Sequence, residues 1–394
     1  MIKNCLKQVV AISLTLISLS SFADSIPQSA KTQWRIGVEV GGGYVPQSSA
    51  YLKGENELGK RIEANLAGTL RLDFSDDRLN RDGYTYKGVY QGLGIGVNSF
   101  FSNRLLGTPV LVDVFQGAPI VSISDRLSFG YEWKFGAAMG WKHPGDDSGL
   151  TNRVVSTSVT AHLGVGLKFI YRVDDKLGIS FGLEANHFSN GNTSLPNNGV
   201  NNILASVGAT WTINPVAVPN ERKPEAEKIF HAKWFYDIIG YGAWRRKVVH
   251  VGDIPEGQLC PGKFGVAGLQ FSPMRWLDKW VAVGPSLDLQ WDESAALDRY
   301  WVEGTEGNTI RFQRPPFSKQ ISVGLSAHAE LTAPIFAVNI GLGLNVLCPH
   351  STKRFYQSLT LKTFVTDRIF LNVGYRLGSF SDPENLMLGL GFRL

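Results

Sequence analysis

Beyond its first 23 residues the sequence has no run of 18 or more consecutive apolar residues, so it predicts no transmembrane helix. Charge is also scarce: charged residues make up 19% of the chain and the net charge is only +5. So small a charge gives no case for nucleic-acid binding. Glycine, with 43 residues, and aromatic side chains, at 11%, are abundant instead. This composition is typical of a barrel that is apolar outside and polar inside.

Cysteine is rare, with three residues in the whole chain. Residues 1–23 resemble a cleaved secretory signal peptide, with a basic start, a short apolar stretch and small residues up to Ala23. Cleavage removes Cys5, and export places Cys260 and Cys348 in an oxidising compartment. There the pair either forms one disulfide, which we favour, or stays free. Neither cysteine has the spacing of a metal site, so we predict no metal.

Segments of about ten residues with alternating apolar and polar side chains recur from Trp34 to the C-terminus. Their approximate centres lie at residues 34–45, 61–74, 86–100, 108–122, 126–140, 153–172, 176–190, 200–214, 232–248, 263–275, 279–291, 318–330, 334–347, 353–365, 368–379 and 384–394. Long connections alternate with short ones. The pattern predicts an all-β fold: an antiparallel transmembrane β-barrel of the outer-membrane type, with an even number of strands, roughly 12–16.

We expect residues 24–394 to form one such barrel. Residues 24–214 are its first part and contain the active-site hairpin described below, residues 176–214. Residues 215–231 are a long polar connection, and residues 232–394 add further strands. The alternative is two eight-stranded units divided at this connection. The lack of an internal repeat favours one barrel.

Three polar residues extend the apolar faces of two neighbouring segments. His187 and Ser189 continue the face of Phe181, and Asn201 begins the face of Ile203, because side chains in a strand alternate with period two. Pairing positions that sum to about 390 sets Ser189 opposite Asn201. A slip of two residues sets Asn201 beside His187 instead. In either register the three side chains face the lipid near the outer end of the barrel.

This trio predicts acyl-transfer chemistry on a lipid ester. Ser189 is the expected nucleophile and His187 its general base. Asn201 would orient the imidazole, as the third member of a triad does. The backbone amides of Asn190 and Gly191, with the Asn190 side chain, are the expected oxyanion hole.

The same residues carry a family resemblance. His187-Phe188-Ser189-Asn190-Gly191, followed by Pro196-Asn197, Gly199 and Val200, resembles the signature of the PagL-type lipid A 3-O-deacylases, or acyloxyacyl hydrolases. The resemblance implies an active-site loop containing Pro196, Asn197 and Gly199. It also implies a serine esterase in the outer membrane of a Gram-negative bacterium. Such an enzyme removes an ester-linked 3-hydroxyacyl chain from the lipid A of lipopolysaccharide, without a metal or other cofactor. The smallest members have eight strands and would end near residue 214.

One departure supports a second hypothesis. Where the best-known deacylases have a Glu that orients the His, this chain has Asn201. The sequence His-x-Ser-Asn-Gly, with an Asn twelve residues beyond the Ser, also resembles outer-membrane phospholipase A, a larger barrel that uses calcium and dimerises. Its substrate would be a phospholipid. A third hypothesis is a porin-like barrel without enzymatic activity. The oligomeric state stays open.

The remaining polar motifs have simpler interpretations. His162 and His328 lie on polar faces, so we expect hydrogen-bonded residues of the lumen. We interpret Arg245-Arg246-Lys247 as a cluster at the barrel rim rather than a contact to lipid A phosphates. Asp146-Asp147 is interpreted as a pair of solvated loop acids rather than a calcium site.

Overall fold

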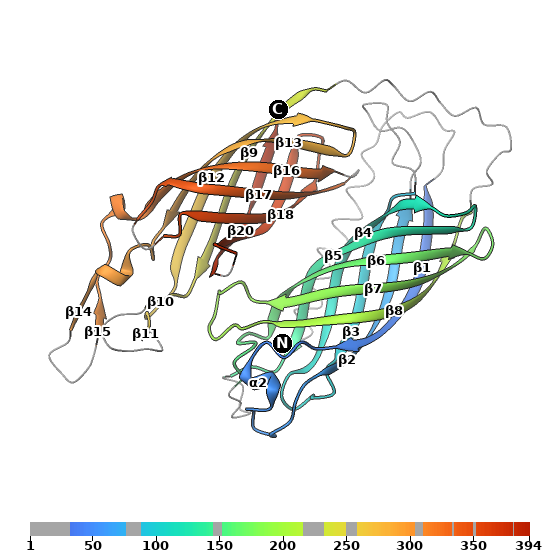
Figure 1. The fold of residues 1–394 in the computed structure, drawn as a ribbon, viewed down its shortest axis with the longest axis horizontal. Coiled ribbons are helices and arrows are strands. Elements are labelled where there is room, and N and C mark those ends of the chain that lie inside the picture. Colours follow the sequence, from blue (N-terminus) through green and yellow to red (C-terminus); the bar gives the residue numbers. More distant parts are fainter. Residues whose placement is uncertain are drawn as a thin grey trace.

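The computed structural model of the chain consists of antiparallel strands arranged as two closed barrels (Figure 1). It describes residues 32–75, 88–144, 152–215, 232–249, 258–303, 310–332, 335–349, 352–380 and 382–394. The first barrel contains β1 (Gln33–Tyr44), β2 (Ala64–Ser75), β3 (Tyr90–Ser99), β4 (Gly107–Ser122), β5 (Leu127–Trp141), β6 (Val159–Arg172), β7 (Leu177–Ser189) and β8 (Val200–Thr212). The second contains β9 (Trp234–Arg245), β12 (Phe264–Trp276), β13 (Val281–Asp292), β16 (Ile321–Thr332), β17 (Phe336–Leu347), β18 (Phe355–Phe364), β19 (Ile369–Gly378) and β20 (Asp382–Arg393). The expected signal peptide, residues 1–23, lies outside the described residues.

The first barrel closes because its eighth strand returns to its first. β8 pairs with β1 beginning at Ile203 and Tyr44, and β20 pairs with β9 beginning at Leu388 and Gly242. The expectation of one large barrel is therefore wrong, whereas the even strand number is confirmed. An open sheet edge in lipid would leave backbone groups unpaired. Eight strands already enclose an interior that side chains can fill, so each half of the chain closes on itself.

Alternation along the strands separates an apolar outer face from a polar interior. On β7, Phe181 and Leu183 are 54% and 60% exposed, whereas Glu184 is buried. On β20, Leu390 is 59% exposed. This is the pattern of an outer-membrane barrel. None of the helices in the described parts of the chain is long and apolar enough to span a membrane.

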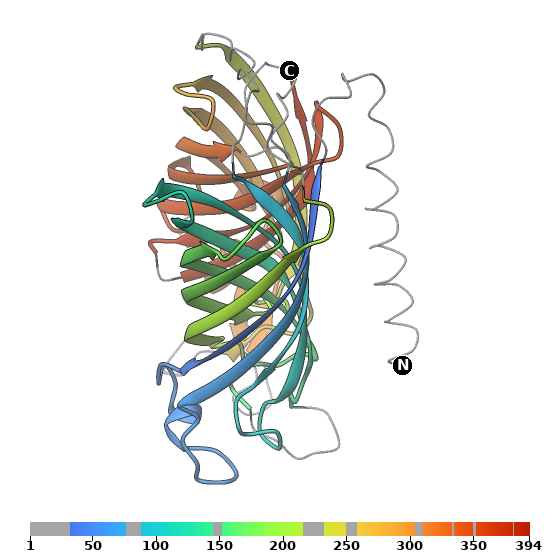
Figure 2. The same cartoon turned by 90° about the vertical axis from the view of Figure 1, so that its right-hand side faces the viewer.

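The two ends of the barrels differ in their connections. Turns of four residues join the strands at one end, namely residues 123–126, 173–176, 277–280 and 365–368. Longer connections, including residues 45–63 and 190–199, join them at the other. Figure 2 shows the loop with α2 (Ala50–Lys53) beyond the strand ends of the first barrel. Short turns face the periplasm in such barrels, so the long loops mark the outer end.

Two small hairpins extend the outer loops of the second barrel. They are β10 (Val248–Val249) with β11 (Gln258–Leu259), and β14 (Trp301–Glu303) with β15 (Ile310–Phe312). Short 3-10 helices, η2 (Leu297–Arg299) and η3 (Phe317–Lys319), flank the second hairpin.

Ion pairs fill the lumen of the first barrel. Arg71 Nη2 lies 2.6 Å from Glu132 Oε2, and Lys134 Nζ lies 2.8 Å from Glu39 Oε1. Lys168 contacts both Glu39 and Glu132. Removing one partner would leave an uncompensated buried charge, so the cluster holds its members in place. A similar cluster occupies the second lumen and comprises Asp237, Glu330, Lys362 and Arg393.

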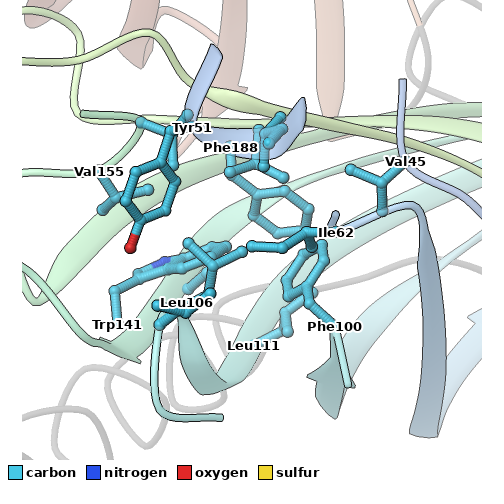
Figure 3. Close-up of a cluster of buried hydrophobic side chains, with 14 residues drawn as sticks. Val45, Tyr51, Ile62, Phe100, Leu106, Leu111, Trp141, Val155 and Phe188 are labelled. Atoms are coloured by element: carbon cyan, nitrogen blue, oxygen red, sulfur yellow. The ribbon is translucent and has the colours of Figure 1, made fainter. Parts of the chain in front are cut away.

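An apolar cap covers the outer end of the first barrel. Its fourteen buried residues come from α2, the outer loops and the strand ends, as Figure 3 shows. Ser49 begins α2 by accepting a hydrogen bond from the Leu52 amide, and Gly54 ends it with φ +114°. Phe188 of β7 is fully buried in this cap, with its ring 5.4 Å from that of Trp141. The cap therefore anchors the outer end of β7.

We expect the protein to conduct far less than a porin in planar lipid bilayers, because buried ion clusters obstruct both lumens and the apolar cap covers the outer end of the first. Single-channel recording checks this, with a general porin measured in the same bilayers as the positive control. Steady current steps of porin size would support the porin hypothesis and contradict the filled lumen.

Candidate active site

His187, Ser189 and Asn201 lie together at the outer end of the β7–β8 pair. His187 and Ser189 are near the end of β7, and Asn201 is the second residue of β8. All three are half-buried, on the face where Leu183 and Ile203 are exposed to lipid. The structure therefore brings the three predicted residues onto the lipid-facing surface of the first barrel.

The register of the hairpin sets His187 opposite Asn201. The register that places Ser189 opposite Asn201 is therefore wrong, and the slip by two residues is the one observed. The reason lies on the opposite face of the same strands. There Asn186 Nδ2 donates to Asn202 Oδ1 at 2.9 Å inside the lumen, which fixes the pairing.

The imidazole of His187 is oriented by Asn201. His187 Nδ1 lies 2.7 Å from Asn201 Oδ1. Because a carbonyl oxygen accepts, Nδ1 carries the proton in this arrangement and Nε2 keeps its lone pair. Glu184 points into the lumen, where it pairs with Lys134 at 2.7 Å. The geometry thus suits a neutral histidine base held by an amide.

Ser189 adjoins the turn that follows β7. The Gly191 amide donates to Ser189 Oγ at 3.1 Å, and Gly191 has φ +62°. Gly199, with φ +71°, lies close to both His187 and Ser189. A Cβ added to Gly199 would lie 3.0 Å from His187 Cε1, so glycine permits the close approach of the loop to the imidazole.

Asn190 has a different place from the one expected. Its side-chain Nδ2 donates to Ser156 Oγ and to the Ser194 carbonyl, both at 3.0 Å. Its backbone amide donates to Asn197 Oδ1 at 3.1 Å. These bonds hold the loop and occupy the donors of Asn190. Of the predicted oxyanion donors, the Gly191 amide is the one aimed at Ser189.

Two loop residues that the resemblance assigns to the site lie beside it. Pro196 is exposed and follows a cis peptide bond from Leu195. Asn197 is the loop's internal acceptor, and its Nδ2 donates to Asn192 Oδ1 at 3.2 Å. They shape the loop that follows Ser189.

A polar network in the lumen supports the site from behind. His162 Nδ1 lies 2.7 Å from Asp113 Oδ1, and His162 Nε2 lies 3.0 Å from Asn186 Oδ1. The His162 ring also stacks on Phe188, with centroids 4.6 Å apart. The prediction of a hydrogen-bonded lumen histidine is confirmed. Sequence reasoning missed Asn186, although its position next to His187 on a polar face was a usable signal.

A second Ser–His–Asn trio lies in the lumen of the second barrel. Ser326 Oγ is 2.9 Å from His328 Nε2, and His328 Nδ1 is 2.5 Å from Asn339 Oδ1. However, Ser326 donates its one proton to Asp288 Oδ2 at 2.6 Å, so His328 does not receive it. All members are buried in the lumen. This trio has the same three residue types as the candidate site but lies away from the lipid. It therefore provides a control for the trio of His187, Ser189 and Asn201.

The cysteines and the basic rim cluster differ from expectation. Cys260 and Cys348 are free, so the favoured disulfide is wrong. Cys260 is buried against Val249 and Leu297, and burial raises the pKa of its thiol to about 11. Arg245 turns inward and pairs with Asp292, while the charge of Arg245, together with burial, lowers the pKa of Lys247.

The described residues contain no cluster of three His, Cys, Asp or Glu side chains that could hold a metal ion. Asp146-Asp147 lies outside the part of the chain that the structure describes. The expectation that the protein needs no metal stays a prediction.

The fold and the site define a class of protein: an outer-membrane β-barrel with a Ser, a His and an Asn on its lipid-facing surface. The family model "Lipid A 3-O-deacylase (PagL)" matches residues 82–210, which include the candidate site. The model "Acyloxyacyl hydrolase, C-terminal domain" matches residues 234–394, the whole second barrel. The chain belongs to this PagL-type family. Membership supports an ester hydrolase of the outer membrane, with lipid A as the class of substrate.

Other comparisons add little. No curated protein matches the chain. Among solved structures, it is similar to the siderophore receptor PirA from Acinetobacter baumannii, with 11% identity and a TM-score of 0.20, over 87% of this chain and 56% of that one. A deltaS2 mutant of the monoaromatic hydrocarbon channel TodX matches with 10% identity and a TM-score of 0.17, over 95% and 90%. The NanC porin matches with 10% identity and a TM-score of 0.16, over 90% and 96%. Scores this low carry no argument about function.

Proposed function

We propose that the protein is a lipid A 3-O-deacylase-like serine esterase that removes an ester-linked 3-hydroxyacyl chain from lipopolysaccharide at the outer leaflet. The observation that carries this proposal is the 2.7 Å contact between His187 Nδ1 and Asn201 Oδ1 on the lipid-facing surface. It leaves Nε2 with a lone pair, and Ser189 lies two residues away on the same face. The site lies at the outer end of the apolar face, where we expect the lipid ester bonds, so substrate can approach sideways from the membrane.

The reaction follows from these positions. Ser189 Oγ attacks the ester carbonyl carbon while His187 Nε2 takes the hydroxyl proton. The negative charge that develops on the carbonyl oxygen is stabilised by the Gly191 amide, which already lies beside Ser189 Oγ. The bond between the carbonyl carbon and the sugar oxygen then breaks, His187 gives the proton to that oxygen so that the sugar leaves as a free hydroxyl, and an acyl-enzyme remains. Water, deprotonated by His187, then attacks the acyl carbon, the bond to Ser189 Oγ breaks, Oγ takes the proton back from His187, and the 3-hydroxy acid is released.

Asn201 sets the orientation of His187 without supplying charge. We expect Asn201→Ala to lower kcat by about 10- to 100-fold, because the imidazole loses its orienting partner. Asn201→Asp should instead raise kcat above wild type, since a carboxylate stabilises the imidazolium that forms during attack. Steady-state kinetics on purified lipopolysaccharide in detergent micelles measure both. Equal rates for wild type and Asn201→Ala would remove Asn201 from the site.

The proposed chemistry needs no metal. We expect hydrolysis to be unchanged by EDTA and by added calcium, because the nucleophile, the base and the oxyanion donor all come from the chain. Rates with EDTA, with calcium and with neither, measured on the same enzyme sample, check this. Loss of activity in EDTA and its return with calcium would favour the phospholipase A hypothesis.

A further inference from the structure

The loop that follows Ser189 contacts the second barrel. The Arg246 amide, just after β9, donates to the Asn192 carbonyl at 3.0 Å. Leu386 of β20 packs on Gly191, so that a Cβ added there would lie 2.6 to 3.1 Å from three Leu386 carbons. Figure 1 shows the β7–β8 loop reaching toward the outer end of β20. The candidate site therefore lies at the junction of the two barrels.

Leu386 differs from the other leucines on its face of β20. Leu388 and Leu390 are 40% and 59% exposed, as lipid-facing residues are, whereas Leu386 is half-buried. The loop of the first barrel accounts for this burial. Gly191 provides the matching surface, because it has no side chain to keep Leu386 away.

The barrels also touch closer to their inner ends. The ring of Trp133 on β5 packs edge-on against Phe336 at the start of β17, with centroids 5.2 Å apart at 88°. Trp280 of the second barrel packs against Val89 and Ala118 of the first. Contacts at two heights restrict rocking of one barrel against the other. Leu386 therefore holds a defined position beside the loop.

One short turn thus carries both contacts. Gly191 donates its amide to Ser189 Oγ, and the next residue, Asn192, is bonded to the second barrel. We propose that the second barrel positions the catalytic turn, with Leu386 as the positioning residue that holds the Gly191 amide beside Ser189. The inference rests on the proposed function, in which Ser189 is the nucleophile. It gives the second barrel a role in the reaction that acts through the turn.

The first test uses three single variants of the full chain. Leu386→Ala is expected to lower kcat about tenfold with KM unchanged, since a small misplacement of an oxyanion donor slows the chemical step rather than binding. Leu386→Met, which keeps the volume, should restore most of the rate. Leu390→Ala, on the same face four residues further along β20, should match wild type. Equal kinetics for Leu386→Ala and Leu390→Ala would overturn the positioning role.

A cross-link tests the junction independently of activity. Asn192→Cys with Arg246→Cys, in a chain with Cys260→Ser and Cys348→Ser, is expected to form a disulfide in the membrane, because the two backbones are in hydrogen-bond contact. Failure to cross-link would overturn the inference. Wild-type protein without hydrolytic activity, together with an efficient cross-link, would instead count against the proposed function and leave the junction intact.

Discussion

Replacing Ser189 with alanine is expected to lower the rate of lipid A deacylation by at least about 10³-fold, because removing a nucleophile that acts with its base removes nearly all of their joint contribution. The barrel should remain folded, since the Ser189 side chain is half-buried at the end of β7, on the face opposite the lumen. Mass spectrometry of lipid A and phospholipids from membranes that express each variant measures the outcome. Heat-modifiable migration on gels verifies folding.

The matched control is Ser326→Ala, which removes the serine of the lumen trio. That variant should deacylate like wild type, because its hydroxyl is buried away from lipid and gives its proton to Asp288. Loss of activity in Ser326→Ala but not in Ser189→Ala would place the active site in the second barrel.

The lipid products also separate the competing functions. Loss of one hydroxyacyl chain from lipid A, with wild type only, supports the deacylase. Lysophospholipid and free fatty acid without a change in lipid A would move the assignment to a phospholipase. No change in either lipid would favour a barrel without enzymatic activity.

The strands were predictable from the sequence because lipid and lumen impose opposite polarity on successive residues. Segment 176–190, for example, corresponds to β7. The predicted segment 153–172 begins too early, because β6 begins at Val159. The apolar residues Val154 and Val155 lie in the loop before it. Asn152 Oδ1 accepts from both of their amides, and the two side chains enter the apolar cap. An apolar residue can therefore lie either on the lipid-facing side of a strand or in the apolar cap, and alternation does not distinguish the two.

The strand at which each barrel closes could not be predicted from alternation. Alternation indicates that a segment is a strand, but it does not indicate which distant strand pairs with it. The pairing of β8 with β1 joins residues far apart in sequence, such as Ile203 and Tyr44. The same eight strands with a different last pairing would belong to a larger barrel.

In the candidate site, too, the features set by neighbouring residues could be predicted, whereas those set by distant segments could not. Parity alone placed His187, Ser189 and Asn201 on one face. The register needed the lumen bond between Asn186 and Asn202, because only the two faces together fix the pairing. The use of Asn190 within its loop, and the packing of Leu386 on Gly191, depend on segments that no local pattern connects.

His187→Ala is expected to cost about as much as Ser189→Ala, on the order of 10³-fold or more in kcat, because a serine without its base is a weak nucleophile. The sharper result is the double variant. If the two residues act as one unit, His187→Ala combined with Ser189→Ala should be no slower than either single variant. Independent residues would instead multiply their losses.

The control for this cycle is His328→Gln, which changes the lumen histidine and should leave kcat near wild type if the second barrel keeps its fold. Kinetics of wild type, the two single variants and the double variant on the same lipopolysaccharide complete the measurement. A double variant slower than both singles by the product of their losses would contradict a shared Ser189–His187 mechanism. Because Asn201 holds Nδ1 of His187 and Ser189 lies two residues away on the same face, we expect the two residues to act together and their losses to be non-additive.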